Sequence, residues 1–274
     1  MKPTLLFIII FILIVALYFS FLSLQKIFLL PLTGLTHLID GVVSILLGIK
    51  IWHDLKTEKN SAATKKYFTY FFLFLGIFQL ILALPHLSLY SNQSSFPTLM
   101  ALAFIIGHIF LYIALAFTLL ASLELYLSNK KIKYAAFSAI TLLGAFITYT
   151  NIIKPNTPIF DTKTGITLLN ANPVVGQLIL IIVLLGWGVS AIIFIYNGIR
   201  LYRVNNNATA RNLLIALGLI FLIIGGPLHD ITKKSVHYLI ADLLVLIGFM
   251  LMASGVFYWT EEDKLTNTEP NKLE

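Results

Sequence analysis

The sequence predicts an all-α integral membrane protein, a bundle of eight transmembrane helices. Of its 274 residues, 58% are apolar and only 11% are charged, and one soluble core of this length cannot bury so much apolar surface. The apolar residues fall into runs of about 20, which is the length needed to cross a hydrocarbon core of roughly 30 Å. The Lys and Arg residues gather in short clusters between these runs, as in proteins oriented in a membrane.

Each apolar run is assigned to one helix, in order along the chain. The predicted spans are residues 4–24, 33–53, 67–88, 98–127, 134–152, 174–200, 210–228 and 236–259. The first span has an alternative interpretation as a cleaved signal peptide, which would leave seven helices. An uncleaved helix is favoured, because the run is long for a signal peptide and no small-residue cleavage motif follows it.

Two segments outside the spans have their own patterns. Residues 159–168 alternate in a way that predicts strand, turn and strand, with Gly165 near the turn, so we expect a small β-hairpin on the outer face. Residues 261–274 form a polar tail, and its composition predicts disorder.

The basic residues predict the orientation. The loops after the second, fourth and sixth spans carry most of the 19 Lys and Arg residues, and the alternate loops carry few. The positive-inside rule therefore places both termini in the cytoplasm, with the chain in the plasma membrane. The net charge of +7 does not indicate nucleic-acid binding, because its positions are those of membrane loops, and the expected partner is the lipid bilayer.

An internal repeat is a further expectation. Residues 48–52 read Gly-Ile-Lys-Ile-Trp, and residues 198–202 read Gly-Ile-Arg-Leu-Tyr. In the spans that follow, a Gly precedes a Pro by nine positions in both copies, within 76–86 and within 218–229. Repeated helical hairpins would give this pattern. The alternative is that charged helix ends and proline stops recur independently.

Five of the six histidines fall at the predicted outer end of the spans. The candidate metal ligands are His37, Asp40, His86, His108 and His237, and the candidate haem ligands are His37, His86, His108, His229 and His237. Imidazole and carboxylate bind zinc, copper and non-haem iron, and two imidazoles from facing helices hold a haem. Both kinds of site require histidines from different helices to converge.

The same residues have structural interpretations. Histidines at helix ends are common near the headgroups, and a lone histidine within a span can be satisfied by a neighbouring hydroxyl or backbone carbonyl. Asp40 and His108 lie inside apolar runs, where ionisable groups are costly and are therefore functional candidates. At the cytoplasmic end, Glu124 is interpreted as a structural charge that pairs with Lys130 or Arg203.

Three functions follow as hypotheses. The first is metal handling or electron transfer at the outer face by a bound transition metal or haem. The second is a proton-coupled transporter for a small solute, with Asp40, His108 and Asp242 lining an outer vestibule. The third is a non-catalytic subunit of a larger membrane complex. The chain has no cysteine, which excludes disulfides and thiolate metal sites, and whether it is an enzyme stays open.

Overall fold

The computed structural model describes residues 31–57, 63–87, 89, 94–170, 172–203, 205–231 and 234–268. These ranges contain seven helical spans that are long and apolar enough to cross a membrane, which confirms the predicted class of an all-α membrane bundle. The predicted count of eight is one more than this part of the chain contains, because residues 4–24 lie outside the described ranges.

The helices follow the predicted spans closely. Their bounds are α2 (Leu32–Thr57), α3 (Ala63–Leu87), α4 (Phe96–Tyr126), α5 (Lys130–Ile153), α6 (Pro173–Val183), η1 (Leu184–Gly188), α7 (Val189–Leu201), α8 (Asn206–Ile231) and α9 (Ser235–Thr268). The segments α6, η1 and α7 form one continuous span. Helix α9 continues eight residues into the predicted tail, because residues 261–268 contain neither Gly nor Pro and include good helix formers.

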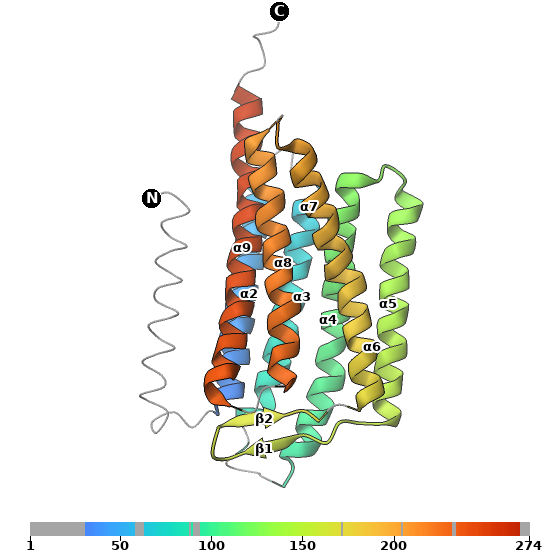
Figure 1. The fold of residues 1–274 in the computed structure, drawn as a ribbon, viewed down its shortest axis with the longest axis vertical. Coiled ribbons are helices and arrows are strands. Elements are labelled where there is room, and N and C mark those ends of the chain that lie inside the picture. Colours follow the sequence, from blue (N-terminus) through green and yellow to red (C-terminus); the bar gives the residue numbers. More distant parts are fainter. Residues whose placement is uncertain are drawn as a thin grey trace, which may run out of the picture.

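Neighbours in the bundle are mostly neighbours in sequence. Helix α2 packs on α3, α3 on α4 and α8 on α9, while α9 returns to contact α2 (Figure 1). The helices run along one common direction, and the two short strands lie across one end (Figure 1). We call this the hairpin end; α2 and α9 begin there and α3 ends there. The opposite end, where α5 and α8 begin, is called the basic end because it carries Lys56, Lys130 and Arg200.

The predicted β-hairpin is confirmed. Strands β1 (Ile159–Asp161) and β2 (Ile166–Leu168) pair in antiparallel fashion. Gly165 has φ +69°, a left-handed conformation that favours glycine. The Asp161 carboxylate accepts hydrogen bonds from the Thr164 hydroxyl (2.8 Å) and the Lys163 amide (2.9 Å), and these bonds hold its pKa below the usual value.

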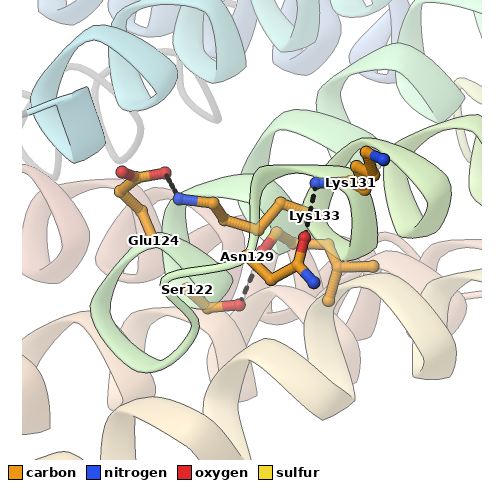
Figure 2. A network of polar contacts seen from close by, with 6 residues as sticks. Ser122, Glu124, Asn129, Lys131 and Lys133 are labelled. Atoms are coloured by element: carbon orange, nitrogen blue, oxygen red, sulfur yellow. Dashed lines mark hydrogen bonds and ion pairs between the residues drawn. The ribbon is translucent and has the colours of Figure 1, made fainter.

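Helices α4 and α5 are joined by a tight turn at the basic end (Figure 1), and Figure 2 shows the polar contacts around it. Asn129 caps α5, since its side-chain oxygen accepts a hydrogen bond from the Lys131 amide at 3.0 Å. Lys133 folds back to pair with Glu124 at 2.6 Å, and the Lys133 side chain is only 6% exposed. The predicted partners of Glu124 are therefore corrected to Lys133, which lies on the face of α5 that packs against α4.

Glycines allow the closest helix contacts. A Cβ on Gly41 would lie 3.1 Å from the Gly76 carbonyl oxygen, and a Cβ on Gly76 would lie 2.9 Å from that of Gly41. Helices α2 and α3 therefore touch backbone to backbone at this level.

The glycines of the proposed repeat form two pairs, Gly48 with Gly198 and Gly76 with Gly218, and only the first pair packs in the same way in both copies. In the first pair, a Cβ on Gly48 or Gly198 would meet a leucine of the next helix at 3.0 and 3.1 Å. In the second pair, Gly76 packs on the preceding helix, whereas Gly218 packs on the following one, against Gly248. The duplication stays a prediction, supported only by the first pair.

The long span from α6 to α7 contains one π-helical turn, η1. Its Gly186 packs against Leu115 of α4, where an added Cβ would be 3.0 Å from the leucine side chain. The Gly186 carbonyl accepts a hydrogen bond from the Ser190 hydroxyl at 2.6 Å, and Ser122 of α4 donates to Ser190 at 3.2 Å. This turn is thus fixed to the centre of the bundle.

Candidate functional site

Helix α2 carries a polar stripe at the hairpin end. Thr33, His37, Asp40 and Ser44 are spaced by three or four residues, so they share one helical face, and all four are buried. The Ser44 hydroxyl donates to the Phe72 carbonyl at 2.8 Å, which shows that this face meets α3.

The stripe is matched by polar groups of α3. His37 Nδ1 lies 2.6 Å from the Gln79 side-chain oxygen. A carboxamide oxygen can only accept, so Nδ1 carries the hydrogen and donates it. Through this bond, Gln79 links α3 to α2.

His86 lies closer to the hairpin end than His37, by about one helical turn. Its Nδ1 is 3.1 Å from the Leu82 carbonyl, and its Nε2 is 2.8 Å from the Thr167 hydroxyl oxygen. Since a carbonyl only accepts, Nδ1 donates, and in the neutral ring Nε2 accepts from the hydroxyl. A Cβ on Gly34 would collide with the His86 side chain, so His86 lies directly against α2, one turn from His37.

Asp40 is the most unusual residue of the stripe. Its side chain is 0% exposed, and neither carboxylate oxygen has a hydrogen-bond partner among the described residues. An ionised aspartate near the centre of a span costs about 3 kcal/mol even on insertion scales. A buried carboxylate in such surroundings is stable when a proton or a cation accompanies it.

A second buried carboxylate belongs to α9. Asp242 is 0% exposed and continues a buried stripe through Leu246 and Phe249. The Phe249 ring lies 6.4 Å from that of Phe72 of α3, which is the residue whose carbonyl binds Ser44.

This contact fixes the relative depths of the two acids. Asp40 lies one helical turn from Ser44 towards the hairpin end, and Asp242 lies two turns from Phe249 in the same direction. Both stripes face α3, so Asp242 lies on the α3 side of α9. We call the buried region around Asp40, where α2 packs on α3, the Asp40 compartment. The side of α9 that carries Asp242 could not be predicted from spacing, because the rotation of a helix depends on what it packs against.

The other predicted histidines do not join this compartment. His108 Nδ1 bonds to the Phe104 carbonyl one turn earlier at 2.8 Å, and its ring packs 3.8 Å from the Phe104 ring and 5.3 Å from that of Phe78. His237 is exposed in the first turn of α9. His229 lies on α8, but its side chain is outside the described part of the structure.

These positions reduce the number of predicted metal or haem ligands that lie near one another. Among the described side chains, no group of three or more His, Cys, Asp or Glu is placed to hold a metal ion. His37 and His86 lie near each other, with Asp40 one turn from His37 along α2, while His108 and His237 lie elsewhere because their helices present them to aromatic rings and to the surface. Binding of a metal or haem stays a prediction.

Thr33 and Thr167 belong to this region and were not selected from the sequence. Thr167 joins β2 to both α3 and α2, because its hydroxyl binds His86 and its amide donates to the Thr33 hydroxyl at 2.9 Å. The predicted hairpin pointed to the region of Thr167, and nothing in the sequence pointed to Thr33.

Comparison with known proteins does not assign this chain to a family. No protein family, curated protein or solved structure matches this chain. The function is therefore inferred from the geometry of the buried acids.

Proposed function

We propose that the protein is a proton-coupled membrane transporter for a small solute, in which Asp40 takes up and releases the proton. The observation that supports this most is the complete burial of Asp40 without a hydrogen-bond partner among the described residues. Ionisable groups inside a membrane bundle typically line ion or proton pathways. A static structural role would be served as well by asparagine or leucine at lower cost.

The buried surroundings of Asp40 can link uptake and release of its proton to a change in helix packing. When Asp40 is protonated, its charge is neutralised and the closed arrangement is stable. When the proton leaves, the carboxylate favours water, so its ionisation favours an arrangement in which water reaches α2. Asp242 is also buried within the bundle, and two ionised carboxylates in low-dielectric surroundings repel each other. Protonation of the acids is thereby linked to the packing of α2 against α3 and α9.

His37 and Gln79 have a positioning role in this proposal. The bond between them (2.6 Å) uses the histidine Nδ1–H and fixes the ring one turn above Asp40. This arrangement keeps the ring from turning freely in the path between Asp40 and the hairpin end.

The proposal is tested by infrared difference spectroscopy of the protein reconstituted in liposomes, recorded between acidic and alkaline pH. We expect a carbonyl band of a protonated carboxylic acid in the wild type and its loss in Asp40→Asn. The matched control is Asp54→Asn, which removes an acid at the basic end that pairs with Lys50. Identical spectra for the wild type and Asp40→Asn would overturn the proposal.

Transport itself is measured in the same liposomes. A pH-sensitive dye inside the vesicles reports proton entry when pools of amino acids, sugars or organic acids are added outside. We expect entry with one pool in the wild type and in Asp54→Asn, but not in Asp40→Asn. Solute entry that is equal with and without Asp40 would show that transport is not proton-coupled.

A metal site is the second candidate, because His37 and His86 lie side by side with Asp40 one turn away. A metal at His86 would have to displace Thr167 from Nε2, whereas at His37 the ligating nitrogen would be Nε2, because Nδ1 donates to Gln79. Elemental analysis of protein purified without chelator tests this, with His237→Ala as the control for His86→Ala. Stoichiometric metal that is lost only in His86→Ala would favour this candidate. The role of a subunit in a larger complex stays a prediction.

A further inference from the structure

The β-hairpin lies across the end of the bundle where α2 and α9 begin (Figure 1). Ile166 of β2 is 1% exposed and packs with Leu32 at the start of α2 and Tyr238 at the start of α9. On the other side, the Phe160 ring of β1 lies 6.0 Å from that of Phe96 in α4. The hairpin therefore contacts the helices that surround the compartment.

Three hydrogen bonds hold it in place. The Thr167 amide donates to the Thr33 hydroxyl (2.9 Å), the Thr33 amide donates to the Gly165 carbonyl (3.3 Å), and the Thr167 hydroxyl binds His86 (2.8 Å). All of them connect the hairpin to α2 or α3, the two helices that carry the polar stripe and its partners. Asp40 lies two turns below Thr33, roughly 10 Å along α2.

The attachment is small enough to be reversible. Each strand has three residues. Among the described residues, the apolar cluster that joins the hairpin to α2 and α9 has three buried side chains, one of which is Ile166 of the hairpin itself. Segments with few buried contacts open locally without unfolding the rest of a protein. The bundle beneath is held by extensive helix packing and does not depend on the hairpin for its core.

We propose that the hairpin of residues 159–168 is the gate on its side of the Asp40 compartment, closed in this structure and opened by release of Thr167 from Thr33 and His86. This inference rests on the proposed function, because it describes access to Asp40. In the closed state the hairpin blocks water from the hairpin end. In the open state the path past His86 and His37 leads to the carboxylate.

The chain has no cysteine, so a disulfide can be introduced as a reversible lock. A Cβ on Gly165 would lie 3.5 Å from the Leu32 Cβ, within the range that disulfides need. The double variant Leu32→Cys/Gly165→Cys is oxidised in liposomes, and the infrared band of the Asp40 acid is followed after transfer to D2O. We expect deuterium exchange of this group to slow at least about tenfold on oxidation and to recover with reductant.

The controls separate the lock from its side effects. Each single-cysteine variant is treated with the same oxidant, and Gly165→Ala reports the strain of a side chain at φ +69°. Failure of the pair to cross-link would place the hairpin away from Leu32 and overturn the gate.

The two proposals fail in different ways. Absence of the Asp40 band in unlocked protein would overturn the proposed function. A band that is present, but exchanges equally fast in locked and reduced protein, would overturn the gate alone.

Discussion

His86 Nε2 and the Thr167 hydroxyl oxygen lie 2.8 Å apart, although 81 residues separate them in the chain. The contact joins the last turn of α3 to the middle of β2. Both groups are buried, so neither can exchange its partner for bulk water while the hairpin is closed.

Replacement of Thr167 by valine should loosen the hairpin. The variant keeps the side-chain shape but leaves His86 Nε2 without its donor, and we expect a loss of about 1–3 kcal/mol in the free energy of unfolding. Thermal unfolding in detergent measures this. Thr162→Val, at an exposed position of the turn, is the control and should change little. Equal stability of both variants would contradict the importance of the bond.

The two buried acids should be energetically coupled. If Asp40 and Asp242 share one environment, replacing either acid changes the stability effect of replacing the other. Denaturation of Asp40→Asn, Asp242→Asn and the double variant at neutral pH forms a double-mutant cycle. We expect a coupling energy of about 0.5 kcal/mol or more. Additive effects would show that the acids lie in separate environments.

Alanine at Gly76 should force α2 and α3 apart. The new methyl group would lie 2.9 Å from the Gly41 carbonyl oxygen, a backbone atom that cannot move alone, so we expect a loss of about 1–3 kcal/mol. Gly176→Ala is the matched control, since no atom lies within 4 Å of its added Cβ. That variant should be neutral or gain up to about 1 kcal/mol from helix propensity. A similar loss for both would disprove the close approach.

The Glu124–Lys133 pair should matter more than a surface pair. In Glu124→Gln the Lys133 ammonium, with a side chain only 6% exposed, loses its counter-charge, and we expect a loss of about 1–3 kcal/mol. The Lys50–Asp54 pair has a lysine side chain that is 58% exposed, so Asp54→Asn should cost less than about 1 kcal/mol. Chemical denaturation of both variants in the same detergent gives the comparison. The opposite order would show that Lys133 finds another acceptor.

The fold was predictable because its main signal is length and hydropathy. Each described helix begins and ends within a few residues of a predicted apolar run, apart from α9, which extends further. The hairpin was predictable because Gly165 marks a turn between two alternating segments. Both features depend on neighbours in sequence.

The site was predictable only in part, because it depends on helix rotation. His37, Asp40 and His86 were selected as candidates, and the structure places His86 near His37, with Asp40 one turn from His37 along α2. His108 shared their depth, but its face of α4 meets Phe78 and Phe104 instead. Asp242 was considered only in the transporter hypothesis, and its position opposite α3 follows from the packing of Phe249 on Phe72.

The π-turn at Leu184–Gly188 has a consequence for the faces of its span. It holds one residue more than an α-turn, so α7 is rotated by about 100° relative to a continuous α-helix extended from α6. Deleting one residue there would restore a regular helix, yet it would turn Asn197 and Phe194 away from the bundle interior that now buries them. The insertion thus sets the phase of α7, and the helix on either side of it tolerates changes in sequence more readily than changes in length.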